Sequence, residues 1–191
     1  MNRTFPVTAL PVRLQESDRE ALERHFLALD AEDRRLRFGL PIGDALVRGY
    51  VSRIDFDDHG VFAIHDESQG IVAAVHVAHA GESAELGLSV LPGHRGTGLG
   101  SALFARAIMH VRNRGVRSVY VHCLVENGAV MHIARKNGMR IASSGGEANA
   151  HLELASPTPY SHYLEWLQDQ HAGALRALRA MVIRPPAARA P

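Results

Sequence analysis

The sequence contains very little cysteine and no long apolar run. Cys123 is the only cysteine among 191 residues, which excludes a disulfide within the chain and a cysteine-based metal cluster. No hydrophobic stretch approaches the ~20 residues that a membrane-spanning helix requires. The first ten residues, MNRTFPVTAL, lack the basic start and apolar core of a signal peptide. We therefore expect a cytoplasmic protein that has no membrane partner.

The sequence also lacks an excess of charge of one sign. It has 21 Lys and Arg against 20 Asp and Glu, and the two signs are interspersed. Such a mixture offers no basic surface for a polyanion, so nucleic acid is not an expected partner. The chain is 46% hydrophobic and 21% charged, which together with its length is typical of one globular domain with a sizeable core.

Twelve histidines raise the question of a metal site, but their spacing argues against one. His76 and His79 are three residues apart in an expected strand, where alternate side chains point to opposite faces of a sheet. His110 and His132 fall on expected helices, and His94 falls in a turn. No group has the spacing of metal ligands, so we expect no metal.

The stretch from 90 to 100, VLPGHRGTGLG, predicts a strand, a tight turn and a helix start in close succession. Gly96, Gly98 and Gly100 carry no β-carbon, so backbone N–H groups at the positive end of the helix are accessible to an anion. Arg95 adds a positive charge beside them. A phosphate-binding turn is therefore indicated, and the alternative is an ordinary helix cap with additional glycines.

Two common phosphate-binding motifs do not match this stretch. The dinucleotide fingerprint requires a third glycine where Ser101 stands, and a P-loop requires Lys followed by Ser or Thr where Leu99 and Gly100 stand. The turn therefore belongs to a different class.

Hydrophobic periodicity and turn residues predict an alternation of strands and helices. A capping box from Ser17 to Glu20 is expected to open the first helix. Residues 60–91 form an expected antiparallel meander, whereas strand, helix and strand across 84–124 imply a parallel pair. The expected strands are 7–14, 60–65, 71–79, 84–91, 116–124, 139–144 and 150–155, and the expected helices are 17–29, 31–37, 44–54, 99–113, 127–136 and 160–181.

Arg-x-x-Gly-x-Gly after Val-x-Pro resembles the acyl-CoA pyrophosphate loop of the GCN5-related N-acetyltransferase (GNAT) superfamily. Residues 29–38, LDAEDRRLRF, and 124–139, LVENGAVMHIARKNGM, are similar to two segments of Pat-type protein-lysine acetyltransferase domains. The resemblance implies an α/β (α+β) GNAT fold with a central mixed, mostly antiparallel sheet of about seven strands flanked by helices. We expect this domain over 1–156, an added C-terminal helix over 157–183 and a disordered tail over 184–191.

This resemblance implies an acyl-CoA-dependent N-acyltransferase that moves an acetyl group from acetyl-CoA directly to a primary amine. Its acceptor is a protein lysine by analogy with the Pat-type domains, or alternatively a small amine, an amino acid or an antibiotic. A non-catalytic acyl-CoA-binding regulatory module is the alternative outside enzymes.

An alkyl amine with a pKa near ~10.4 must lose a proton before it attacks. The resemblance implies that Glu85, on the strand before the glycine turn, is the general base, because Pat-type domains carry a Glu there. The alternative for Glu85 is a solvated strand carboxylate. Ala134 stands where many GNAT enzymes have an acidic Tyr, so the thiolate is expected to leave without a protein acid. Phe38 and His122 are candidate substrate contacts. The resemblance assigns acetyl-CoA to the backbone of Leu88, Ser89 and Val90, to the turn residues Arg95, Gly96, Thr97, Gly98, Leu99 and Gly100, and to Asn127, which is also a candidate helix N-cap.

The last expected helix has apolar and aromatic residues on one stripe, with Trp166 at its edge. We expect this stripe to be buried, either on its own domain or in a homodimer. Its members are Tyr160, Tyr163, Leu164, Leu167, His171, Leu175 and Leu178.

Overall fold

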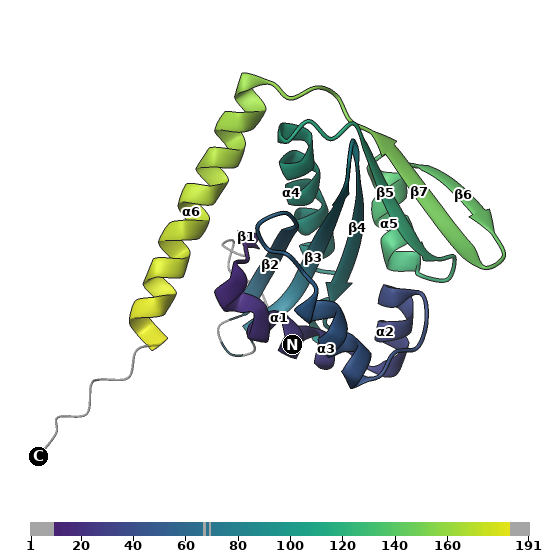
Figure 1. Cartoon of the computed structure of the whole chain (residues 1–191), viewed down its shortest axis with the longest axis horizontal. Coiled ribbons are helices and arrows are strands. Elements are labelled where there is room, and N and C mark those ends of the chain that lie inside the picture. The colour runs from purple at the N-terminus through teal and green to yellow at the C-terminus, as the bar shows by residue number, and fades with distance from the viewer. Residues whose placement is uncertain (1–9, 67, 69, 184–191) are drawn as a thin grey trace, which may run out of the picture.

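The computed structural model describes residues 10–66, 68 and 70–183, and side chains only as far as residue 174 in the last helix. Seven strands form one sheet in the order β1-β2-β3-β4-β5-β7-β6 (Figure 1). Only β4 and β5 are parallel, as the sequence predicted. The strands are β1 (Val12–Arg13), β2 (Gly60–Asp66), β3 (Gly70–Ala80), β4 (Ser83–Val90), β5 (Ser118–Leu124), β6 (Arg140–Ser144) and β7 (Glu147–Glu153).

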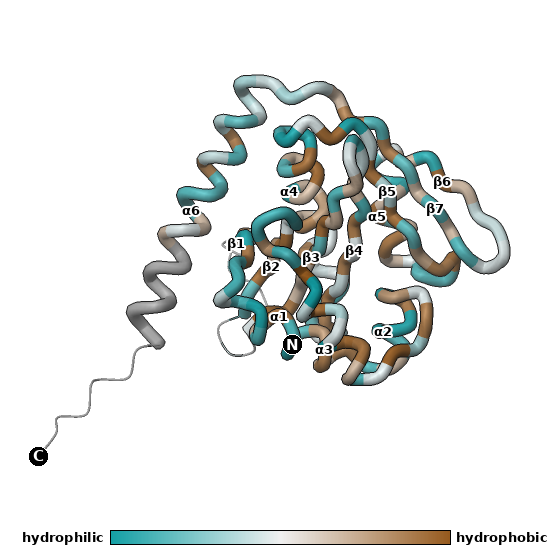
Figure 2. Tube along the Cα trace, viewed as in Figure 1, coloured by the Kyte–Doolittle hydropathy of each residue, from teal (hydrophilic) through white to brown (hydrophobic). Residues whose placement is uncertain are grey.

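Helices cover both faces of this sheet, so the described residues form two large hydrophobic cores, and a third, small cluster holds Cys123, Met131 and Ala148. Figure 2 shows the hydrophobic segments running through the strands and α4. One core holds Leu103 and Phe104 of α4, and the other holds Phe26 of α1 and Val47 of α3. The fold is thus the expected mixed α/β arrangement. The helices are α1 (Arg19–Leu27), α2 (Ala31–Phe38), α3 (Asp44–Ser52), α4 (Leu99–Asn113), α5 (Gly128–Lys136) and α6 (Pro159–Ile183), and the 3₁₀ turns are η1 (Glu16–Asp18) and η2 (Pro92–His94).

The alternation of side chains along β4 decides which of its residues reach each core. Leu86 and Leu88 are buried on the α4 face. The intervening residues point to the face that α1 to α3 cover, where Gly87 is opposite His76 of β3 and Ser89 is opposite Ala74. Glu85 therefore lies on the same face as Gly87 and Ser89.

The beginning of the chain differs from the sequence prediction. The expected strand over 7–14 is only Val12–Arg13 in the described part, and residues 1–9 lie outside it. The predicted capping box is wrong, because a 3₁₀ turn precedes α1 and the reciprocal pair is Gln15 with Asp18. The Gln15 N–H donates to Asp18 Oδ2 at 2.8 Å. The chain therefore enters the helical segment earlier than the Ser17 motif suggested.

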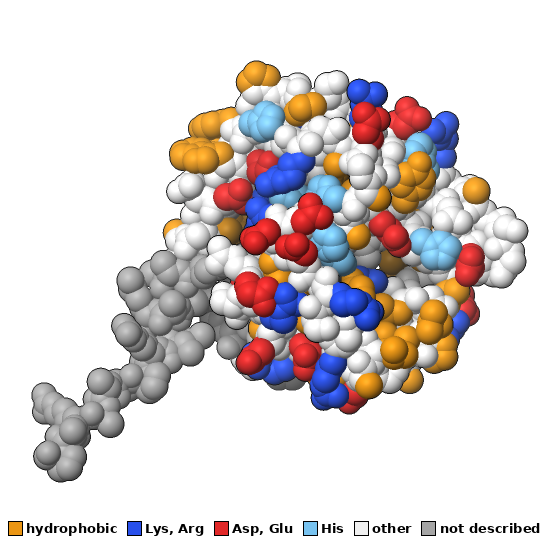
Figure 3. All heavy atoms as spheres, viewed as in Figure 1, with side chains coloured by type: hydrophobic (Ala, Val, Ile, Leu, Met, Phe, Trp, Pro, Cys, Tyr) orange, Lys and Arg blue, Asp and Glu red, His pale blue; other side chains and the backbone are white. Residues whose placement is uncertain are grey.

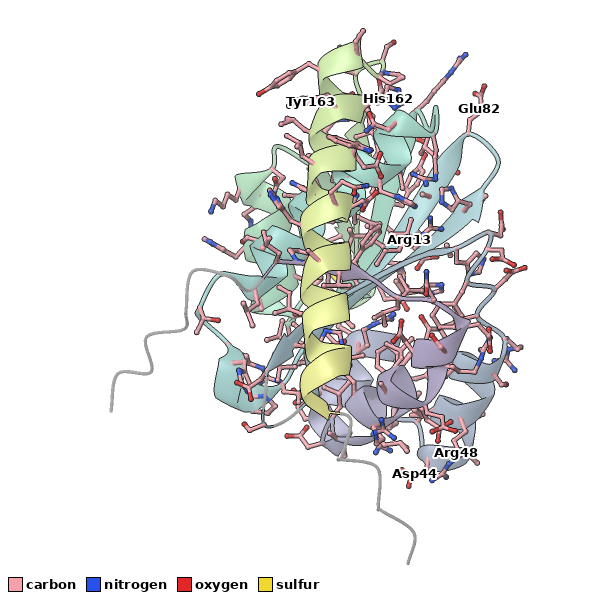
Figure 4. The ribbon with its side chains drawn as sticks, turned by 90° about the vertical axis from the view of Figure 1, so that its left-hand side faces the viewer. Arg13, Asp44, Arg48, Glu82, His162 and Tyr163 are labelled. Carbon is pink, nitrogen blue, oxygen red and sulfur yellow. The ribbon has the colours of Figure 1, made fainter. Side chains whose placement is uncertain are left out.

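Helix α6 packs against α4 and β1 of its own chain. Its buried residues are Ser161, Glu165 and Ala172, whereas Tyr160 and Tyr163 are exposed. Figure 4 looks onto the outer side of α6, where Tyr163 projects to one side of the helix. Of the described members of the stripe, Tyr160, Tyr163 and His171 are exposed, whereas Leu164 and Leu167 are half-buried. The stripe is therefore only partly covered by its own domain, and its burial in a homodimer stays a prediction.

The glutamate of α6 anchors that attachment. Glu165 Oε1 accepts from Arg106 at 3.1 Å and lies 3.0 Å from His110 Nδ1, and its Oε2 accepts from Asn113 at 2.8 Å. Burial alone would raise the pKa of Glu165, but hydrogen bonds from His110 and Asn113 and the charge of Arg106 hold it well below its usual range. The carboxylate is thus charged inside the helix pair.

None of the helices in the described part of the chain has the length and hydropathy to cross a bilayer. Acidic and basic side chains are interspersed on the face that Figure 3 shows. The division into segments 1–156, 157–183 and 184–191 stays a prediction, and the last of them lies outside the described residues.

Candidate active site

Strands β4 and β5 are hydrogen-bonded to each other only over their first residues and then diverge. Their parallel pairing covers three residue pairs and ends at Glu85 opposite Tyr120. Beyond that point β4 continues to Val90 beside β3, while β5 pairs with β7 as far as Leu124. Because each strand stays paired with its outer neighbour while the pairing between β4 and β5 ends, the sheet must open between these two strands. The sequence predicted this divergence only through the family resemblance.

A cavity of about 630 Å³ lies at this end of the two strands. This volume is within the usual range for a small-molecule site. All predicted cofactor contacts except Thr97 line it, namely Leu88, Ser89, Val90, Arg95, Gly96, Gly98, Leu99, Gly100 and Asn127. Other walls come from Leu29 just before α2, from Asp33, Leu36 and Arg37 of α2, and from α5 through residues that include Val130, Ile133 and Lys136.

The glycines of the turn serve two different purposes. Gly96 and Gly98 have φ angles of +72° and +88°, a conformation that side chains other than glycine adopt at a cost. Gly100 has another role, because a β-carbon there would lie 3.0 Å from Ile133 Cδ1. The third glycine therefore allows α5 to pack closely against α4.

The start of α4 directs free backbone donors toward the cavity. The Ala102 N–H donates to the Gly98 carbonyl at 3.0 Å, and the three preceding N–H groups have no acceptor within the helix. These belong to Leu99, Gly100 and Ser101, all of which line the cavity. Together with the positive end of a 15-residue helix, they fit an anionic group such as a diphosphate.

Arg95 is held beside the turn by two interactions. Its Nε donates to the Val90 carbonyl at 3.2 Å, and its Nη2 forms an ion pair with Asp33. The other carboxylate oxygen of Asp33 is buried without a hydrogen bond. Thr97 does not line the cavity, and its hydroxyl donates to the His94 carbonyl at 2.6 Å. The turn thus has a positive charge that the fold partly neutralises.

Ser89 and Asn127 are both held by hydrogen bonds to other parts of the fold. Ser89 Oγ lies 2.7 Å from His25 Nε2, and His25 Nδ1 lies 3.0 Å from the Ile71 carbonyl. Burial lowers the pKa of His25 to about 4, so the ring is neutral. Its Nδ1–H donates to the Ile71 carbonyl, and its Nε2 accepts a hydrogen bond from the Ser89 hydroxyl. Asn127 accepts from the Val130 N–H as the N-cap of α5 and donates to the Leu36 carbonyl of α2.

Glu85 occupies the last paired position before the two strands separate. Its side chain is exposed, and no hydrogen bond or ion pair joins it to the rest of the described chain. It lies on the α1 to α3 face, one alternate position before Gly87. Its carboxylate is therefore free to accept a proton, and its assignment as general base stays a prediction.

The two candidate substrate contacts lie outside the cavity lining. Phe38 packs on Phe26 and Tyr50, with ring centroids 5.7 and 5.1 Å away. His122 is exposed on β5, where its Nδ1 lies 2.7 Å from Asn149 Oδ1. Their roles stay predictions. Elsewhere in the described chain, His, Cys, Asp and Glu do not gather in threes in a way that would hold a metal ion.

Sequence reasoning missed a chain of polar side chains that ends at the cavity. Arg37 Nη2 donates to Tyr50 Oη at 2.9 Å, Tyr50 Oη lies 2.6 Å from His76 Nδ1, and His76 Nε2 lies 2.9 Å from His59 Nδ1. Burial lowers the pKa of His76 to about 3, and the charge of Arg37 contributes in the same direction. The available signal was the resemblance of segment 29–38, which contains Arg37 but assigned it no role.

A mixed sheet that opens between two parallel strands, with a glycine turn at the opening, defines the class of acyl-CoA-dependent transferases with the GNAT fold. The family model described as "Acetyltransferase (GNAT) family" matches residues 13–139. The chain therefore belongs to this family and is an N-acetyltransferase. No curated protein matches it.

Solved structures share the fold at low sequence identity. The GNAT domain of S. lividans PAT is 21% identical with a TM-score of 0.64, covering 75% of this chain and 89% of that one. Spermidine N-acetyltransferase from Vibrio cholerae, in complex with CoA and spermine, is 19% identical with a TM-score of 0.59 over 75% and 94%. Phosphinothricin acetyltransferase from Sinorhizobium meliloti, in complex with AcCoA, is 15% identical with a TM-score of 0.62 over 80% and 95%.

Proposed function

We propose that this protein transfers the acetyl group of acetyl-CoA directly to a primary amine, with Glu85 as the general base. The observation that carries the proposal is the end of β4–β5 pairing at Glu85, three residues before Leu88, where β4 begins to line a cavity that the glycine turn also lines. The N–H groups of Leu99, Gly100 and Ser101 would bind the diphosphate. The backbone of 88–90, which is not paired with β5, would bind the pantetheine amides.

The proposed reaction needs one proton acceptor from the chain. Acetyl-CoA supplies an activated acetyl thioester. Glu85 takes a proton from the ammonium form of the acceptor, directly or through water, so that a neutral amine is present. The amine nitrogen then bonds to the acetyl carbon as the carbon–sulfur bond breaks, the nitrogen loses its second proton to water, and CoA leaves as a thiolate. Ala134 is buried where many relatives have a Tyr, so solvent protonates this thiolate.

The acceptor has two candidate classes. A protein lysine is supported by the resemblance of segments 29–38 and 124–139 to Pat-type domains. A small amine is supported by neighbours whose names specify spermidine and phosphinothricin. Two further proposals follow from the sequence: a cytoplasmic location, in keeping with a single buried thiol, and a homodimer through the exposed aromatic residues of α6, which include Trp166.

The test is CoA release from acetyl-CoA across lysine peptides, N-terminal peptides, polyamines, amino acids and aminoglycosides, with Cys123 subtracted from the thiol signal. Glu85→Gln should lower kcat by about 100- to 10,000-fold, the contribution of a general base, while the Kd of acetyl-CoA stays the same. Glu82→Gln, which removes another exposed carboxylate near the start of β4, is the matched control. Equal turnover of Glu85→Gln and wild type would refute the assignment, and CoA binding without turnover on any acceptor would favour a regulatory module.

A further inference from the structure

Arg37 extends from α2 onto the backbone of β4 at Gly87. A β-carbon on Gly87 would lie 2.3 Å from Arg37 Nη2 and 2.4 Å from its Cζ. Only glycine leaves room for the guanidinium at this position. Because Gly87 comes two residues after the last β4–β5 pair, the guanidinium is placed where the sheet opens, and Arg37 also lines the cavity.

Three aromatic rings and one hydroxyl hold this guanidinium in place. Its Cζ lies 4.9 Å from the ring centroid of Phe38 and 5.6 Å from those of Phe26 and Tyr50. An arginine side chain can only donate hydrogen bonds, so the Tyr50 oxygen accepts one from Arg37, and the Tyr50 hydroxyl donates one to Nδ1 of His76. The position of the charge is therefore fixed before any ligand binds, which lowers the entropy cost of binding.

This arginine has no acidic partner in the described part of the chain. No Asp or Glu lies within ion-pair distance of it, and its Nε is buried without a hydrogen bond. Other arginines of the same helix do have such partners, since Arg34 lies 2.7 Å from Asp44 and Arg35 lies 2.7 Å from Glu32. The aromatic rings offset part of the cost of burying an unpaired cation. A planar guanidinium with free N–H groups is suited to binding a carboxylate.

We propose that Arg37 binds a carboxylate of the acceptor, so that the acceptor is a small amino acid carrying both an amine and a carboxylate. Glu85 and Gly87 share one face of β4 and are separated by roughly 6.6 Å along the strand, so the amine faces Glu85 while the carboxylate rests on Arg37. This inference rests on the proposed function and specifies its substrate class. The diphosphate of acetyl-CoA has its own site at the start of α4, beyond Val90.

The experiment compares acceptors that differ only in the carboxylate. Glycine, β-alanine, γ-aminobutyrate and the larger free amino acids are assayed for CoA release, each beside its own carboxamide, with rates divided by the fraction of unprotonated amine. A lysine peptide with neutral ends is the reference acceptor. The preferred carboxylate should exceed its carboxamide in kcat/KM by about 10- to 100-fold, the contribution of one hydrogen bond to a charged group.

Two substitutions assign this preference to Arg37. Arg37→Met should bring the carboxylate-to-carboxamide ratio close to one by raising KM for the carboxylate, and Arg37→Lys should retain part of the preference, because it keeps the charge without the planar fork. Arg24→Met on α1, which removes an exposed arginine, should leave the ratio unchanged. Thermal unfolding and the Kd of acetyl-CoA show whether each variant is folded.

Two results would overturn the inference alone: acetylation of lysine peptides or neutral amines with no gain from a carboxylate, or an equal loss of rate for acid and amide in both Arg37 variants. If no acceptor releases CoA although acetyl-CoA binds, the proposed function fails as well.

Discussion

Two inward-facing arginines, Arg106 and Arg37, stand in opposite electrostatic surroundings. Each lies over a phenylalanine ring, Arg106 at 4.4 Å from Phe62 and Arg37 at 4.9 Å from Phe38. Arg106 is 3% exposed and has two carboxylate partners, Glu165 and Asp169, at 3.1 and 2.5 Å. Arg37 has no such partner in the described chain and lines the cavity. The fold neutralises the arginine that joins two helices and leaves a positive charge where a ligand would bind.

Replacing each of the two arginines tests this contrast, and the largest expected effect is on the free energy of unfolding. Arg106→Met leaves the buried Glu165 carboxylate with only the half-exposed Arg114, at 3.2 Å, as a guanidinium partner. This should lower the free energy of unfolding by about 3 kcal/mol, the lower end of the range for breaking a buried ion pair. Arg37→Met leaves no buried acid unpaired and should cost less. Urea unfolding of both variants, monitored by circular dichroism, gives the two values.

Arg117→Met is the matched control, because Arg117 is exposed and lies 3.5 Å from an exposed Glu82. A surface pair of this kind contributes ~1 kcal/mol or less. An equal or larger loss for Arg37→Met than for Arg106→Met would show that Arg37 is primarily structural and would remove the contrast.

Acid should destabilise both regions, because each contains histidines that are neutral in the folded state. Burial lowers the pKa of His76, near Arg37, to about 3, and that of His110, near Arg106, to about 4. Below their ordinary pKa of about 6.5 the unfolded chain binds protons that the folded chain does not. Stability is therefore full above pH 6.5 and falls as the pH drops toward 4, by about 2 kcal/mol per histidine at pH 5.

This pH dependence is measured by urea unfolding from pH 8 to 5. His76→Gln removes one group that binds a proton only in the unfolded chain, so it should reduce the slope of unfolding free energy against pH by the contribution of one proton. Replacement of the exposed His162 by Gln should leave the slope unchanged. A slope that is the same in His76→Gln and wild type would show that the pKa of His76 does not differ between the folded and unfolded chains.

Much of the fold was predictable from local sequence, because alternation, capping and glycine positions act over a few residues. Helix α2 and the parallel β4–β5 pair follow from such patterns, and Asn127 is the N-cap that its position suggested. The contact surface of α6 was not predictable, because helical spacing cannot show that Glu165 meets Arg106 from a helix 59 residues away.

The site shows the same limit. The glycine turn was visible in the sequence, but the role of Arg37 depends on the register that places Gly87 opposite His76 and on the packing of α2 across β4. Neither property has a local signature. A glycine inside a strand, such as Gly87, indicates no more than the close approach of some other group.

The smallest expected effect concerns Arg95, which is intermediate between the two arginines because it is paired with Asp33 and is still half exposed. Asp33→Asn removes a negative charge from the cavity wall and releases Arg95 toward the turn. The Kd of acetyl-CoA should fall by about two- to fivefold, as expected for one partly screened charge pair, and calorimetry with Asp57→Asn as an exposed control measures it. Weaker binding in Asp33→Asn would mean instead that Asp33 positions Arg95 for the diphosphate, so that in this chain a paired arginine also serves the ligand.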